Sequence, residues 1–192
     1  MVFLAISEKA YIGCYDGTPT RIDTILDLPG YFLTNSFVPH RNGSLAMRCQ
    51  FLVFYDDGIV FRDGVTIIGS DDCNSYIQRE FYQAKTDSKY GWRRNEWGLY
   101  ELRDSTIKVE FVHHPSPPER YESYIVRYKV IDRHTIQEVF SFENDAFYSD
   151  STLKTYHFMP VENLPSSECW LKSEKWFWCK EGRKAYKRQM KK

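Results

Sequence analysis

The stretch Glu96–His114, EWGLYELRDSTIKVEFVHH, alternates apolar and polar residues on both sides of a short polar turn. A period of two places successive side chains on opposite faces of a strand, so each half predicts a β-strand with one apolar face. A two-residue turn at Asp104 and Ser105 aligns the two apolar faces in one hairpin, with Lys108 and Glu110 facing water. The apolar face is predicted to carry Gly98, Tyr100, Leu102, Ile107, Val109 and Phe111.

The stretch Cys49–Gly64, CQFLVFYDDGIVFRDG, predicts a second hairpin. Its turn is Asp56-Asp57-Gly58, in which Gly58 supplies the left-handed residue of a bulged three-residue turn. With this turn, Arg62 points outward. The residues predicted to face inward are Phe51, Val53, Tyr55, Ile59 and Phe61.

The stretch Tyr124–Phe140, YIVRYKVIDRHTIQEVF, predicts a third hairpin, which turns at Asp132-Arg133-His134. Its first strand places Tyr124, Val126, Tyr128 and Val130 on one face. In the second strand, Glu138 is in line with Ile136 and Phe140, so a charged residue lies on an apolar face. Such a residue is either solvated at the mouth of a barrel or the polar anchor of a ligand site.

Strand-like segments also flank the three hairpins, at Ile25–Asn35 and Leu153–Val161. The segment Ser75–Lys85 fits a short helix or a strand. About eight strands with turns at short intervals are typical of an antiparallel sandwich or barrel. We therefore predict an all-β fold, an antiparallel up-and-down barrel of about eight strands with a short C-terminal helical segment.

The C-terminal part of the chain differs in character from the hairpins. An amphipathic helical pattern over 167–178 predicts a segment that lies against the barrel. Trp170, Trp176 and Trp178 carry too much apolar surface to remain in water, so we expect 170–178 to dock. The last residues, 180–192, hold seven Lys or Arg against one acid and form a basic tail, although the net charge of the whole chain is zero.

Length and composition predict one domain with a sizeable core in these 192 residues. We expect a flexible leader at 1–20, a barrel with its docked segment at 21–179, and the basic tail at 180–192. The leader is either a plain disordered segment or a clipped export segment, because its apolar run is short for a signal peptide. An odd number of cysteines, five, leaves at least one unpaired in the monomer. The cell envelope or periplasm is favoured over the cytoplasm.

Several segments resemble one family of barrels. Gly30-Tyr31 stands where lipocalin-like (calycin) barrels carry a Gly-x-Trp motif, although Phe32 follows in place of Trp. Together with WGLYELRDSTIKVEF, YKVIDRHTI and FMPV…KWFWC, the region 22–179 resembles uncharacterised lipocalin-like proteins of Bacteroidetes bacteria. The resemblance implies a barrel whose interior can hold one small apolar ligand.

Motifs for catalysis are not found. The sequence has no Gly-x-Ser-x-Gly, no phosphate-binding glycine loop and no His-Glu-x-x-His. His113 and His114 are adjacent on a strand and point to opposite faces, so they do not suit one metal ion. His157 is predicted to face solvent. We therefore expect no enzymatic activity, no cofactor and no metal.

Aromatic residues of the predicted inward faces are the candidates for a ligand site. Their rings supply contact area and the tyrosine hydroxyls supply orientation, or else the same side chains fill a solid core. The candidate ligand-binding residues are Tyr55, Tyr100, Phe111, Tyr124, Tyr128 and Glu138. We expect a protein that binds a small hydrophobic molecule or serves as an accessory domain of the cell envelope. The alternative is a protein-interaction or inhibitor module with a solid core, which binds its partner through loops such as 114–120. Nucleic-acid binding through the basic tail is disfavoured. No apolar run reaches the roughly 20 residues of a transmembrane helix.

Overall fold

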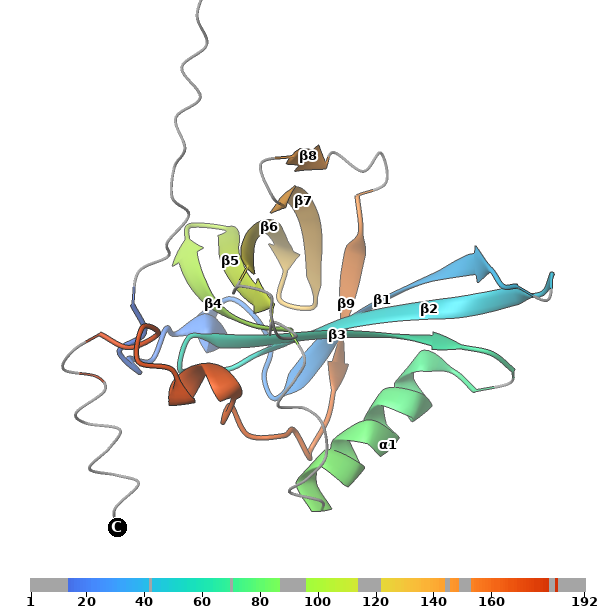
Figure 1. Ribbon diagram of the computed structural model, residues 1–192, viewed down its shortest axis with the longest axis horizontal. Coiled ribbons are helices and arrows are strands. Elements are labelled where there is room, and N and C mark those ends of the chain that lie inside the picture. The colour runs from blue at the N-terminus through green and yellow to red at the C-terminus, as the bar shows by residue number, and fades with distance from the viewer. Residues whose placement is uncertain are drawn as a thin grey trace, which may run out of the picture.

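Successive strands of the protein pair with one another in an antiparallel meander, and the last strand pairs with the first (Figure 1). The computed structural model describes residues 14–41, 43–69, 71–86, 96–113, 122–143, 146–148, 153–179 and residue 182. The strands are β1 (Gly30–Pro39), β2 (Leu45–Phe54), β3 (Ile59–Ile67), β4 (Glu96–Arg103), β5 (Thr106–His113), β6 (Glu122–Asp132), β7 (Thr135–Glu143), β8 (Ala146–Tyr148) and β9 (Thr155–Pro160). The helical elements are α1 (Cys73–Thr86) and the 3-10 turns η1 (Ile22–Thr24) and η3 (Trp170–Ser173).

Closure of the sheet involves the strands β1 to β7 and β9. Strand β9 pairs with β1 on one side and with β7 on the other, and β6 pairs with β7, so the ring is complete. Strand β8 only extends the end of β7. The protein is thus a closed barrel of eight antiparallel strands, as the sequence predicts.

The β4–β5 hairpin has the predicted register, with Gly98 opposite Phe111. Asp104 in its turn has a φ of 53°, the left-handed conformation that tight hairpin turns require. A Cβ atom on Gly98 would lie 2.4 Å from the carbonyl oxygen of Glu110, so a larger residue does not fit. The expectation that Glu110 faces water is wrong, because this residue is only 7% exposed.

The β2–β3 turn is also of the predicted type. The backbone amide of Tyr55 donates to the carbonyl oxygen of Ile59 at 2.9 Å, and Gly58 has a φ of 87°. The predicted orientation of this hairpin is wrong, however, and the reason lies in how the sheet is covered.

Two apolar cores lie on opposite faces of the sheet. The inner core lies inside the barrel and includes Phe32, Leu52, Phe54, Val60, Tyr100, Ile107, Val109, Phe111, Val126, Tyr128, Ile136 and Tyr156. The outer core contains Tyr31, Phe51, Val53, Ile59, Phe61 and Trp97, packed against α1 and the C-terminal segment. The run 51–54 is therefore buried on both faces, and its period cannot indicate which face points inward. Phe51, Val53, Ile59 and Phe61 lie outside the barrel.

One end of the barrel is closed by the segment that precedes β1. Ile22 of η1 and Leu26 are fully buried in the inner core. Arg133, in the β6–β7 turn, holds this segment: its guanidinium donates to the carbonyl oxygen of Thr24 at 3.1 Å and to the carboxylate of Asp27 at 2.6 Å. We call this the closed end of the barrel.

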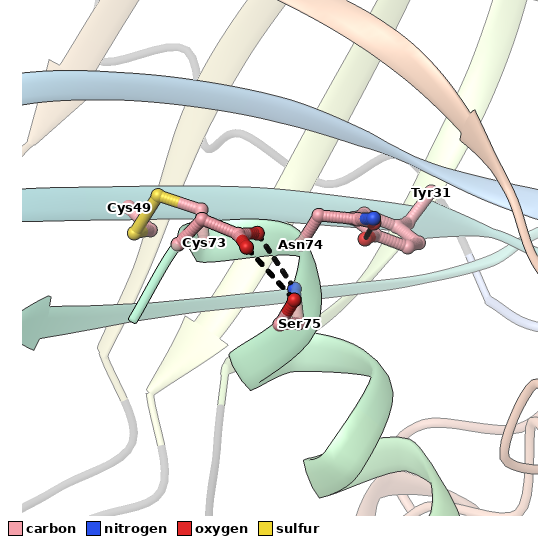
Figure 2. The surroundings of a disulfide bond; sticks show 6 residues. Tyr31, Cys49, Cys73, Asn74 and Ser75 are labelled. Atoms are coloured by element: carbon pink, nitrogen blue, oxygen red, sulfur yellow. Dashed lines mark hydrogen bonds between the residues drawn. A yellow bond between two sulfur atoms is a disulfide. The ribbon is translucent and has the colours of Figure 1, made fainter. Parts of the chain in front are cut away.

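The outer face of β1–β3 is covered by α1, which runs along these strands (Figure 1). The ambiguous stretch Ser75–Lys85 is thus helical. Asp72 caps the helix, because its carboxylate accepts hydrogen bonds from the amide and the hydroxyl of Ser75 at 2.9 and 2.8 Å. Figure 2 shows that the first turn is also fixed to β2 by a disulfide bond between Cys49 and Cys73.

The C-terminal segment docks on the barrel, as predicted. Its residues Trp170, Leu171, Phe177 and Trp178 are buried in the outer core, whereas Trp176 is 43% exposed. Within the segment, the indole nitrogen of Trp178 donates to the carbonyl oxygen of Lys172 at 2.8 Å. The helical part is short and consists of η3.

Cys14 and Tyr15, which belong to the predicted leader, are attached to this C-terminal segment, whereas the amide of Thr20 donates to the carbonyl oxygen of Asp56 in the β2–β3 turn at 2.7 Å. Cys14 forms a disulfide bond with Cys179, across 165 residues of sequence. The ring of Tyr15 is buried and stacks on that of Phe177, with 5.0 Å between their centroids. A flexible leader could therefore extend only over residues before Cys14, and these lie outside the described residues. Among the described cysteines, Cys169 alone is unpaired.

Candidate ligand site in the barrel interior

The residues predicted to line a ligand site do not gather in one place. Tyr100, Phe111, Tyr124 and Tyr128 belong to the inner core or pack against it. Glu138 also meets the interior, since the hydroxyl of Tyr156 donates to its carboxylate at 3.2 Å. Tyr55 packs against the outer core, with its ring stacked 6.1 Å from that of Trp97, so the prediction that it faces inward is wrong.

The hydroxyl of Tyr100 has a structural role at the closed end of the barrel. Its hydroxyl donates to the carbonyl oxygen of Tyr55 at 2.5 Å and lies 2.5 Å from the hydroxyl of Thr20. These bonds join β4, the β2–β3 turn and the segment before η1. The ring of Tyr100 contributes to the inner core, but its hydroxyl already has partners.

The interior contains a charged residue that the sequence prediction assigned to the outside, Arg62. It follows Val60 on the inner face of β3, and its side chain is only 16% exposed. The guanidinium carbon lies 5.5 Å from the centre of the Phe111 ring and 5.9 Å from that of Tyr124. Cations are attracted to the faces of aromatic rings, so these rings stabilise the charge of Arg62 inside the barrel.

Arg62 and Glu96 belong to a small hydrogen-bonded cluster with Tyr124. One guanidinium nitrogen of Arg62 donates to the Tyr124 hydroxyl at 3.3 Å, and this hydroxyl donates to the carboxylate of Glu96 at 2.7 Å. The direct distance from Arg62 Nε to Glu96 Oε2 is longer, 3.7 Å. Tyr124 therefore mediates most of the contact between the two charges.

The hydroxyl of Tyr128 differs from the hydroxyls of its neighbours. Those of Tyr124 and Tyr156 each donate to a carboxylate, of Glu96 and of Glu138 respectively. The Tyr128 hydroxyl is buried from solvent, and no hydrogen-bond partner for it is found among the described residues. A buried donor without an acceptor costs roughly 1–3 kcal/mol, so native proteins rarely keep one without a reason.

The pKa values of these groups show that they interact. Burial by itself lowers the pKa of Arg62, but interactions with Tyr128, Tyr124, Tyr156 and Glu96 raise it above its usual value. Burial raises the pKa of Tyr128 well above its usual value, and nearby Tyr156 and Glu138 add to this. Arg62 is therefore charged and Tyr128 is neutral at physiological pH. Together they offer hydrogen-bond donors inside the barrel.

We call Arg62, Glu96, Tyr124, Tyr128, Glu138 and Tyr156 the interior polar cluster. Sequence reasoning missed Arg62, Glu96 and Tyr156. The available signal was the run Phe51-Leu52-Val53-Phe54, since a strand that is apolar on both faces shows that both are covered. With both faces of β2 covered, the face of the paired strand β3 that carries Arg62 could have been predicted as a possible inner face of the barrel.

A metal-binding group and a membrane-spanning helix are both absent from the described residues. Within the described ranges, no group of three or more His, Cys, Asp or Glu side chains could hold a metal ion. His157, considered as a ligand contact, is exposed, as predicted. None of the described helices has both the length and the apolar character needed to span a bilayer.

The fold and the interior polar cluster define a closed antiparallel β-barrel with hydrogen-bonding groups enclosed among aromatic rings. Comparison of the chain with models of protein families, with curated proteins and with solved structures gives no match. The geometry of the barrel itself is therefore the basis on which its function is inferred.

Proposed function

We propose that the protein is a non-enzymatic, lipocalin-like barrel that binds a small hydrophobic molecule in its interior. Eight-stranded barrels have interiors just wide enough to be filled by side chains or to hold one small ligand. Ligand sites are mostly apolar, with a few polar groups that fix the orientation of the ligand. The observation that carries the proposal is the enclosure of Arg62 and the partnerless Tyr128 hydroxyl among the rings of the inner core.

The alternative is a barrel with a solid core. Rings of the inner core contact one another: those of Phe54 and Tyr100, near the closed end, lie 5.4 Å apart, and those of Tyr128 and Tyr156 lie 5.8 Å apart. A filled closed end leaves the region around Arg62 as the place for a ligand. Ligand binding is the better supported proposal because the inner face encloses the charged Arg62, whose N–H donors outnumber their acceptors, in addition to a partnerless hydroxyl.

Native mass spectrometry of the protein purified from its own host tests this function. We expect a non-covalent adduct that persists under native conditions and disappears when the protein is denatured. The control is the same protein unfolded and refolded without lipid extract, which should show the bare chain mass. Bare chain from the host, together with no binding of any apolar probe, would support a solid core instead.

A protein partner is a second candidate, and exposed apolar side chains support it. Phe37 on β1 is 70% exposed, and Leu45 on β2 is 67% exposed. Both lie where the β1–β2 pair ends away from the closed end, two residues apart in the pairing register. Cross-linking in host extract, with Phe37→Asp as the negative variant, tests this function. The loop 114–120 and the tail after Gly182 lie outside the described residues.

We further propose that the protein resides in the cell envelope or another oxidising compartment. Two disulfide bonds support this location, Cys14–Cys179 and Cys49–Cys73, because such bonds persist where thiols are not kept reduced. Alkylation of host extract before and after reduction tests it. All four cysteines should react only after reduction, and reaction beforehand would favour the cytoplasm.

A further inference from the structure

The donors and acceptors of the interior polar cluster are not balanced. Each carboxylate has its own tyrosine, Tyr124 for Glu96 and Tyr156 for Glu138. The guanidinium of Arg62 carries five N–H donors. Among the described residues, Tyr124 is the only acceptor within hydrogen-bond distance of them, because Glu96 lies 3.7 Å away. The cluster therefore has spare donors.

The hydroxyl of Tyr128 is a second, independent spare donor. It is buried and without a partner in the described part of the chain, although Tyr128 interacts electrostatically with Arg62. Arg62 on β3 and Tyr128 on β6 therefore both carry donors without acceptors in the barrel interior. Phe111 contacts Arg62 from β5, so the surroundings of these donors are largely apolar.

The charges of the cluster decide what kind of acceptor fits. Arg62 contributes one positive charge, and Glu96 and Glu138 contribute one negative charge each, so the cluster as a whole is not positive. An anionic ligand would meet two carboxylates as well as the one guanidinium, and in a poorly solvated interior such like-charge contacts are costly. A cationic ligand would meet Arg62. A neutral acceptor avoids both penalties.

We propose that Arg62 and Tyr128 bind the carbonyl oxygen of a neutral, largely apolar ligand. A carbonyl oxygen has two lone pairs and can accept one hydrogen bond from each of the two donors. This inference rests on the proposed ligand-binding function and adds to it the chemical class of the ligand: ketones, aldehydes, esters or amides on an apolar frame, rather than carboxylic acids or hydrocarbons.

Three probes of nearly equal shape test the inference. They are 2-acetylnaphthalene, its hydrocarbon isostere 2-isopropenylnaphthalene, and the anion 2-naphthoate, each titrated by calorimetry into the full chain. Hydrogen bonds from a charged donor and a hydroxyl should make the ketone bind about ten- to hundredfold more tightly than the hydrocarbon. We expect 2-naphthoate to bind more weakly than the ketone. The carbonyl stretch of the bound, 13C-labelled ketone should move to lower wavenumber.

Two tyrosine-to-phenylalanine variants form a matched pair for this test. Tyr128→Phe removes the interior hydroxyl and should reduce the preference for the ketone about five- to tenfold. Tyr55→Phe removes another buried hydroxyl without a described partner, but in the outer core, and should leave the preference unchanged. Neither variant loses a described hydrogen bond, so both should fold, which circular dichroism would verify.

The outcomes separate this inference from the function on which it rests. If ketone and hydrocarbon bind equally well, the barrel binds apolar ligands and the carbonyl assignment is wrong. If 2-naphthoate binds most tightly, the cluster is an anion site and the inference is overturned. If no probe binds and the host protein carries no adduct, the ligand-binding function itself fails. Loss of ketone preference in Tyr128→Phe alone supports the inference.

Discussion

Arg62 and Glu96 are opposite each other on the neighbouring strands β3 and β4, yet they are joined mainly through the hydroxyl of Tyr124. The guanidinium and the carboxylate are 3.7 Å apart, and their side chains are 16% and 34% exposed. A positive charge enclosed in a barrel is thus held by one carboxylate, one hydroxyl and the faces of two rings. The arrangement keeps Arg62 charged without using all its donors.

Replacement of Arg62 by Met should destabilise the protein by about 2–3 kcal/mol, because Glu96 would lose its cationic neighbour in a partly buried site. The double variant Arg62→Met, Glu96→Gln should recover about 1 kcal/mol of this, since no unpaired charge then remains. Urea denaturation of the wild type, Arg62→Met, Glu96→Gln and the double variant measures the coupling energy between the two side chains. Strictly additive effects would show that the two charges do not interact.

Phe111→Ala should lower the free energy of unfolding by roughly 3–5 kcal/mol, because the Phe111 ring is fully buried in the inner core. Lys108, on the other face of the same strand β5, is only half-buried. Lys108→Ala should change stability by less than about 0.5 kcal/mol. Equal effects in denaturant titrations would mean that the faces of β5 are wrongly assigned.

Gly98→Ala should destabilise the barrel by roughly 1–3 kcal/mol, because the added Cβ would lie 2.4 Å from the carbonyl oxygen of Glu110. Relief of this contact requires the backbones of β4 and β5 to move apart. Ser123→Ala, on the exposed surface of β6, is the control and should have little effect. Thermal unfolding followed by circular dichroism compares the two, and an unchanged melting temperature for Gly98→Ala would contradict the close approach.

The hairpins could be predicted because their register depends on local features, namely turn residues and a period of two. Asp104-Ser105 and Asp56-Asp57-Gly58 each fix a register within a few residues of sequence. Which face of a hairpin points into the barrel is not decided by the local sequence. It depends on what covers the opposite face, and for β2 and β3 that cover comes from α1 and from residues more than a hundred positions away. The sequence pattern therefore predicted the pairing of Val53 and its neighbours and not their orientation.

Removal of the chain after Cys179 should leave the melting temperature nearly unchanged, because the basic residues beyond it repel one another. Removal of everything from Cys169 onward should cause unfolding or aggregation. It exposes the outer core that Trp170, Leu171 and Trp178 cover, and it also removes the partner of Cys14. Differential scanning fluorimetry and light scattering distinguish these results. A stable, soluble short form would instead mark the tryptophans as a surface for a partner.

Asp63 should make stability depend on pH. Burial, opposed by the hydrogen bond from the Gly64 amide, raises the pKa of the Asp63 carboxyl from 3.8 to about 6. The folded state then binds the proton more tightly than the unfolded state, so this contribution is complete below about pH 4 and is lost as pH rises to about 6. Asp63→Asn should remove the decrease and raise stability at pH 7 by about 1–2 kcal/mol. Urea titrations between pH 4 and 7.5 test this, and parallel curves for both proteins would contradict it.

The candidate site was predictable only in part, for the same reason as the fold. Tyr124, Tyr128 and Phe111 lie on strands β5 and β6, whose outer faces carry charged residues such as Lys108 and Arg127, so the inner face could be recognised. Arg62 lies on a strand that is covered on both sides. From the sequence alone, a charged residue on such a strand is predicted to face solvent unless the elements that cover the other face of the strand are known. The pairing of Tyr156 with Glu138 depends on the closure of the barrel by β9, which no local pattern specifies.

The Cys14–Cys179 bond joins the two ends of the described barrel covalently, so that the chain between them forms a closed ring. The Cα atoms of these two residues are 4.8 Å apart, about the spacing of adjacent strands in one sheet. The folded barrel therefore does not require its strands to follow one another in the natural chain order. A circular permutant that joins these positions by a short peptide and opens between Asp104 and Ser105 keeps every strand whole. It also moves both termini to a turn at the closed end, where a reporter could be fused without approaching the interior polar cluster.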